Sequence, residues 1–88
     1  MNATHAQAAL LPSSRAQRPH LLEVNSDGAY RRVLGFDANN QQAAALVRKG
    51  VQSLATVDPG VTFRITERQS GEVLLNYSVR FGWTEGTR

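Results

Sequence analysis

The sequence of 88 residues contains no cysteine, and it has no run of eighteen apolar residues. Without cysteine, neither a disulfide framework nor a thiolate metal site can form, and the composition fits a reducing cytosol. The absence of a long apolar run excludes a membrane-spanning helix. We also expect no secretory signal, because no basic residue precedes the short apolar segment 8–11. We therefore expect a soluble, cytoplasmic protein.

Groups that carry catalysis are scarce as well. The two histidines, His5 and His20, fall within or at the end of the N-terminal segment without an acidic partner, so we expect them to be solvated. The sequence contains no P-loop, dinucleotide fingerprint, HExxH or GxSxG motif. Asp27-Gly28 is typical of a turn, since the carboxylates that would complete a calcium loop are missing. These absences argue against an enzyme and indicate no cofactor, metal site or small-molecule substrate.

The net charge of +3 is concentrated near the N-terminus. Residues 1–19 contain Arg15 and Arg18 and no acid, whereas residues 20–88 contain eight basic and seven acidic residues. A folded part so close to neutral is weak evidence for nucleic-acid binding.

Residues 1–19 have no sustained periodicity, and Pro12 and Pro19 interrupt any helix there. We interpret them as a flexible, disordered tail, with an organelle transit peptide as the less favoured alternative. Residues 20–88 then form a single domain. A domain of about seventy residues buries only roughly 60% of the surface that its unfolded chain exposes. Self-association often supplies the missing stability in such small domains.

The first structured segment is predicted to be a β-hairpin. Two β-prone runs, 21–24 and 29–36, flank Asn-Ser-Asp-Gly at 25–28. With a three-residue loop ending at Gly28, Val24 would oppose Tyr30 and Leu22 would oppose Arg32. One face would then carry the apolar residues Leu22, Val24, Tyr30, Leu34 and Phe36. Arg32 shares that face, which fits this register poorly.

The hydrophobic period changes to that of a helix in residues 39–57. The apolar stripe consists of Ala43, Leu46, Val47, Gly50, Val51 and Leu54. Candidate N-terminal caps are Asp37, Asn39 and Asn40, and Asp58-Pro59-Gly60 marks the end. Glycine inside a helix costs about 1 kcal/mol relative to alanine. We expect that Gly50 is compensated by close approach of the helix to a bulky sheet residue.

The last segment has the clearest pattern, because large apolar residues alternate with polar ones in 61–66 and 73–81. Strict alternation indicates half-buried strands. A two-residue turn would set the apolar face of one strand against the polar face of the other, so we predict a three-residue loop with Gly71 in the left-handed conformation. The predicted pairs are Arg68 with Glu72, Ile65 with Leu75, Phe63 with Tyr77, and Val61 with Val79. Trp83 is expected at the edge of the core.

The order of elements predicts an α+β fold of ββαββ type. A four-stranded, mainly antiparallel sheet would carry one helix packed on one face, and the tail would precede it. The other sheet face would be bare. Its polar side chains form the candidate binding site, which comprises Arg64, Thr66, Arg68, Asn76, Ser78 and Arg80.

This bare face has three interpretations: an ordinary solvated surface, a contact with a protein partner or a second copy, or a nucleic-acid site. Aromatic residues that would stack on bases, Phe63, Tyr77 and Phe81, belong to the core-facing set. We favour a small non-enzymatic protein-interaction module of the accessory or inhibitor type, such as phages and mobile elements encode. It would bind a partner protein, with a homodimer as one form of assembly. The alternative is a nucleic-acid-binding domain that uses the arginine-bearing face and the basic tail.

Overall fold

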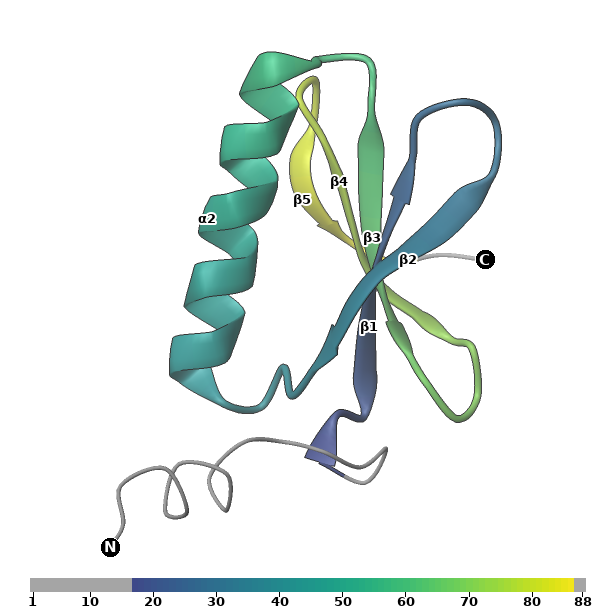
Figure 1. Ribbon diagram of the computed structural model, residues 1–88, viewed down its shortest axis with the longest axis vertical. Coiled ribbons are helices and arrows are strands. Elements are labelled where there is room, and N and C mark those ends of the chain that lie inside the picture. Colours follow the sequence, from purple (N-terminus) through teal and green to yellow (C-terminus); the bar gives the residue numbers. More distant parts are fainter. Residues whose placement is uncertain (1–16, 87–88) are drawn as a thin grey trace, which may run out of the picture.

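The computed structural model describes residues 17–86, and the predicted tail lies almost entirely outside this range. The strands in chain order are β1 (His20–Asn25), β2 (Tyr30–Phe36), β3 (Thr62–Glu67), β4 (Val73–Ser78) and β5 (Gly82–Glu85), and the helix is α2 (Gln41–Val57). They form one antiparallel sheet in the order β2-β1-β3-β4-β5, with α2 along one face (Figure 1). The α+β class is confirmed. The sheet has five strands, however, and not the predicted four.

The core lies between α2 and the sheet. It consists of Leu22, Phe36, Val51, Ala55, Val61, Phe63 and Ile65. On the helix, the residues that face the sheet are spaced four apart: Ala43, Val47, Val51 and Ala55. The helix begins after Asn40, whose side chain accepts a hydrogen bond from the backbone N–H of Ala43, and it ends at Asp58. Both ends agree with the capping residues that the sequence offers.

The fifth strand arises because the chain turns back earlier than the alternation suggests. β4 ends at Ser78, whose Oγ accepts a hydrogen bond from the backbone N–H of Phe81, and Gly82 follows with a φ of 70°. The side chain of Phe81 is therefore 70% exposed, and not part of the core as predicted. Trp83 pairs with Tyr77 on β4 and packs against the core, so its predicted place at the core edge is confirmed.

The first hairpin differs from the predicted register. Its loop has four residues, because the side chain of Asn25 accepts a hydrogen bond from the N–H of Gly28 and Asn25 pairs with Tyr30. The extra loop residue places Tyr30 and Arg32 on the sheet face away from α2. A bulge at position 33 then puts Leu34, and not the predicted Arg32, opposite Leu22. The misfit of Arg32 on an apolar face is thereby removed.

The second hairpin is predicted more closely. Phe63 pairs with Tyr77 and Ile65 with Leu75, as expected, and Gly71 has a left-handed φ of 77°. A shift in register after Ile65 makes Thr66 pair with Val73, and the N–H of Glu67 bonds to the carbonyl of Glu72. The predicted pair of Arg68 with Glu72 is therefore wrong, because β4 contains one extra residue that alternation alone does not reveal. The predicted pair of Val61 with Val79 is wrong for another reason: β3 begins at Thr62 and β4 ends at Ser78.

Gly50 is not compensated by close packing, contrary to expectation. A Cβ added at Gly50 would meet no atom within 4 Å. The glycine lies instead on an outward flank of α2, where Leu46 and Leu54 are 71% and 52% exposed. Half of the predicted apolar stripe thus faces away from the core.

Replacing Gly50 by alanine is expected to raise the free energy of unfolding by about 0.5 to 1 kcal/mol. The new methyl group meets open space, so only helix propensity changes. Urea unfolding followed by circular dichroism would measure it. Gly71→Ala is the contrasting variant, because its φ of 77° should make the same methyl group destabilising. A Gly50→Ala protein less stable than the wild type would contradict the open position.

Candidate functional site

The predicted polar site is only partly assembled. Arg64 and Asn76 are cross-strand neighbours on the sheet face away from α2, and Thr66 and Ser78 share that face. Arg68 lies in the turn that follows β3. Arg80 lies in the turn between β4 and β5, where its guanidinium is 5.1 Å from the centroid of the Phe81 ring. Arg80 is therefore not a member of the sheet face.

Arg64 is held by its neighbours within the protein. Its Nε donates a 2.7 Å hydrogen bond to Oε1 of Glu23 on β1, and both side chains are mostly buried. The guanidinium carbon also lies 3.9 Å from the centroid of the Tyr30 ring, and the Tyr30 hydroxyl bonds to the hydroxyl of Thr62. An arginine fixed by an ion pair and an aromatic ring is poorly disposed to bind a phosphate. These contacts make Arg64 a structural residue.

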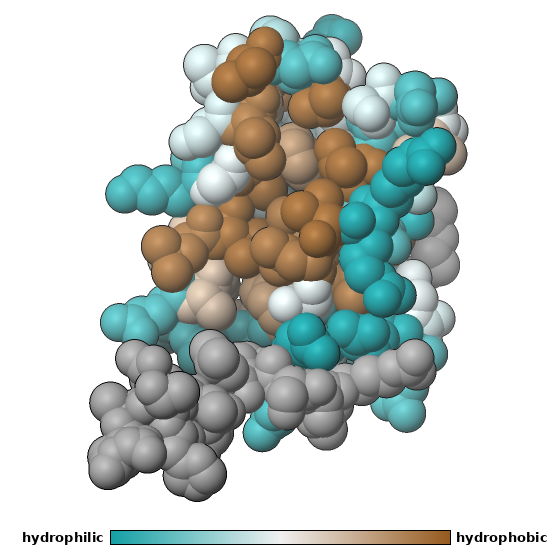
Figure 2. Space-filling model, viewed as in Figure 1, coloured by the Kyte–Doolittle hydropathy of each residue, from teal (hydrophilic) through white to brown (hydrophobic). Residues whose placement is uncertain are grey.

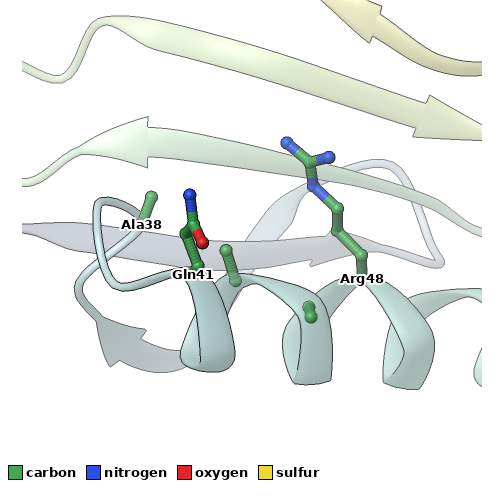
Figure 3. Close-up of a pocket in the computed structure, with 5 residues that line it drawn as sticks. Ala38, Gln41 and Arg48 are labelled. Atoms are coloured by element: carbon green, nitrogen blue, oxygen red, sulfur yellow. The ribbon is translucent and has the colours of Figure 1, made fainter.

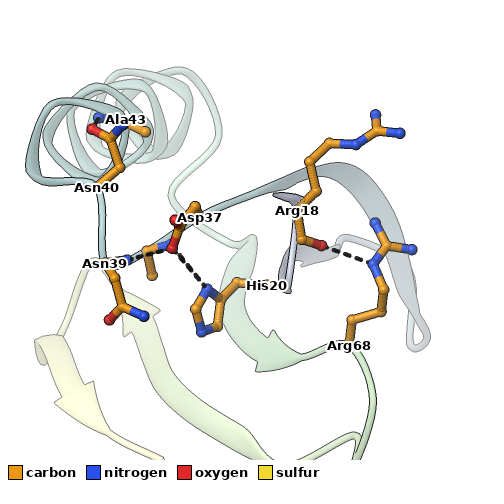
Figure 4. A network of polar contacts seen from close by, with 8 residues as sticks. Arg18, His20, Asp37, Asn39, Asn40, Ala43 and Arg68 are labelled. Carbon is orange, nitrogen blue, oxygen red and sulfur yellow. Dashed lines mark hydrogen bonds and ion pairs between the residues drawn. The ribbon is translucent and has the colours of Figure 1, made fainter. Parts of the chain in front are cut away.

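Arg68 connects three parts of the sheet. Its Nε donates to the carbonyl oxygen of Arg18, and its backbone N–H donates to the carbonyl oxygen of Pro19 (Figure 4). Its guanidinium occupies the space above Gly35 on β2, where an added Cβ would come within 2.6 Å of Nη2. Thr66 on the same face is only 3% exposed. The end of this face beside Arg68 is thus covered, and the hydrogen bonds to Arg18 and Pro19 extend the folded part to before His20.

His20 is buried, contrary to the expectation of a solvated histidine. It is the first residue of β1 and is 8% exposed. Its Nδ1 accepts a hydrogen bond from the backbone N–H of Ala38 and lies 4.0 Å from Oδ1 of Asp37 (Figure 4). His20 therefore fastens the start of β1 to the segment between β2 and α2.

A shallow depression of about 360 Å³ lies beside the N-terminal half of α2. It is lined by Ala38, Gln41, Ala44, Ala45 and Arg48. Gln41 and Arg48 extend from the helix toward the strands, while the alanines leave space between them (Figure 3). Arg48 also lies 5.7 Å from the ring of Trp83 on β5. The lining offers no nucleophile, carboxylate or imidazole for chemistry.

The opposite flank of α2 is the most exposed apolar part of the described chain. Arg48 lies on the flank of α2 near β5. Leu46, Leu54 and Val57 lie on the other flank, which is on the β2 side of the sheet. On β2, Leu34 pairs with core residue Leu22 and faces the same side of the sheet. Figure 2 shows a continuous hydrophobic area from α2 across to the neighbouring strands, bordered by hydrophilic residues on the strand side. We call the set Leu34, Leu46, Gly50, Leu54 and Val57 the α2–β2 surface.

Comparisons with protein families, curated proteins and solved structures found no match to this chain. Within residues 17–86, no cluster of three or more histidine or acidic side chains could hold a metal ion, and no helix is long and apolar enough to cross a membrane. Its exposed apolar residues make the α2–β2 surface the candidate functional site.

Sequence reasoning assigned four of the five residues of this surface to the core-facing set: Leu34, Leu46, Gly50 and Leu54. One signal could have revealed the surface: the apolar residues of the helix form two rows with a spacing of three to four residues, one through Val47 and Val51 and another through Leu46 and Leu54. In this protein the sheet covers only the row through Val47 and Val51. The second row must then face solvent or a partner.

Proposed function

We propose that this protein is a small non-enzymatic interaction module, of the accessory or inhibitor type, that binds a partner protein through the α2–β2 surface. The observation that supports this proposal is the exposure of Leu46, Leu54 and Val57 in one row, with Val57 83% exposed. Contiguous exposed apolar area bordered by polar residues is typical of protein-binding sites. Its removal from water on binding would provide the main favourable free energy.

The alternative of a nucleic-acid-binding domain is less well supported. It relied on Arg64, Arg68 and Arg80 acting together on one face. Arg64 is paired with Glu23, Arg68 bonds to a carbonyl, and Arg80 lies in a separate turn. Phosphate binding by the first two would require breaking contacts that hold the sheet together.

Self-association remains a prediction of the small core. The α2–β2 surface is poorly suited to it, because Arg31 and Lys49 border this surface and neither α2 nor β2 contains an acidic residue. Two copies meeting through this surface would bring like charges together. A homodimer is better served by the free edge of β5, which is Gly82–Glu85.

Photo-crosslinking in the native cells tests the proposed function. A photoreactive amino acid placed at Leu54 should give discrete adducts with a protein of defined mass, because this side chain would be buried in the contact. The matched control is the same amino acid at Gln69, which is exposed in the turn between β3 and β4. The proposal fails if both positions give the same adducts or if Leu54 gives none. Adducts of twice the chain mass would instead support a homodimer.

A further inference from the structure

The charge distribution over the described residues is uneven. α2 and β2 contain Arg31, Arg32, Arg48 and Lys49 and no acid. The other residues of 17–86 contain four basic and seven acidic side chains, so they are net negative. The elements that form the α2–β2 surface are thus the cationic part of a folded domain that is otherwise acidic.

Two of these cations can act on a partner. Arg31 pairs with Val24, so it lies on the same sheet face as α2, and it is exposed. Lys49 on α2 is exposed too, and within residues 17–86 neither of the two forms an ion pair. Cations at the rim of an apolar site steer and orient an acidic partner.

The shape of the surface favours a helix as the bound element. Leu46, Gly50 and Leu54 follow one another at single-turn spacing, and Gly50 leaves a gap between the two leucines. A row of side chains from a second helix packs into such gaps. Addition of a strand to the edge of β2 is less favourable, because the bulge at Val33 and the two consecutive arginines, Arg31 and Arg32, disfavour pairing there.

From these three observations we infer that the α2–β2 surface binds an amphipathic helix with acidic residues beside its apolar face, supplied by a partner protein. This inference rests on the proposed function and specifies the chemistry of the partner. A second copy of this chain has no acidic residue on the corresponding surface. Nucleic acid would leave the exposed leucines without an apolar partner.

Two synthetic peptides of about eighteen residues, or five helical turns, would test the inference with the full chain. Both carry the same leucine face, and their flanking positions are all glutamate in one and all lysine in the other. In isothermal titration calorimetry at low salt, the glutamate peptide should bind at least about tenfold more tightly, and added salt should reduce the difference. A short duplex DNA serves as a third probe.

Variants of the protein locate the binding. Gly50→Met fills the gap with a residue of good helix propensity, and Arg31→Gln together with Lys49→Gln removes two rim cations. Each change should weaken glutamate-peptide binding by about tenfold, because packing and rim charge both contribute. The matched control is Val79→Ser with Arg80→Gln, which alters an exposed apolar residue and an exposed cation in the turn after β4 and should leave binding unchanged.

The outcomes separate the inference from the proposed function. Equal binding of the two peptides, preference for the lysine peptide, or tighter binding of DNA would overturn the acidic-helix inference. The inference would also be overturned if the control variant weakened binding of the glutamate peptide as much as Gly50→Met does. If neither peptide binds while crosslinks from Leu54 to a partner persist, the inference fails and the interaction function stands. If the crosslinks are absent too, both fail.

Discussion

Replacing Phe63 by alanine is expected to leave most of the protein unfolded at room temperature. Phe63 is 2% exposed, and its ring lies at the centre of the core between β3 and α2. Truncating a buried phenylalanine costs about 3 to 5 kcal/mol, because apolar contacts are lost and a cavity remains. A single core of this size rarely supplies more than about 3 to 5 kcal/mol of stability. Circular dichroism and urea unfolding would measure the loss.

Phe81→Ala is the matched control, since the chemical change is identical. Phe81 is 70% exposed in the turn between β4 and β5, so its replacement should change the free energy of unfolding by less than about 0.5 kcal/mol. Sequence alternation places both phenylalanines in the core, and only the early turn separates them. Comparable losses from the two variants would mean that β4 continues through position 81 and that the fifth strand is wrong.

Replacing Arg64 by methionine is expected to cost about 2 to 3 kcal/mol of stability. Methionine keeps much of the aliphatic packing but removes the 2.7 Å bond to Glu23 and the contact with the Tyr30 ring. The carboxylate of Glu23, whose side chain is 18% exposed, would then be left largely buried without its cation. Urea unfolding at neutral pH would measure the effect.

Two further variants test the origin of that loss. Arg80→Met removes an exposed arginine from a turn and should have almost no effect on stability. Glu23→Gln removes the charge from the partner, so the double variant with Arg64→Met should lose less than the sum of the single changes. Strict additivity would show that Arg64 and Glu23 do not interact. Arg64 would then be available for phosphate, and the nucleic-acid alternative would gain support.

Local patterns predicted several elements correctly. The alternation around Phe63 and Tyr77 defines two half-buried strands whose apolar faces must match, and this constraint fixes most of their pairing. Gly71 provides the left-handed residue that closes their connection. Asn40 and Asp58 mark the ends of α2, because helix ends need side-chain or backbone partners close in sequence. Each of these features depends on interactions within one helix or one hairpin.

The candidate site was predicted less well, because the exposure of a side chain depends on which other elements pack against it. Leu46 and Leu54 have the same helical period as the core residues, yet the sheet reaches only the row through Val51. Arg64 has the alternation of a solvated residue, but β1 lies beside β3 and brings Glu23 against it. Nothing near position 64 in the sequence indicates that neighbour.

The sequence by itself determined the α+β class, the single helix with its caps, the apolar pairing of β3 with β4, and the lack of cysteine chemistry. These follow from composition, from hydrophobic period and from local hydrogen bonds. Only the tertiary structure decided the place of β1 between β2 and β3, the bulge at Val33, the burial of His20 and the outward direction of Leu46 and Leu54. Each of these depends on contacts between residues distant in the chain, and no local pattern encodes which surfaces will meet.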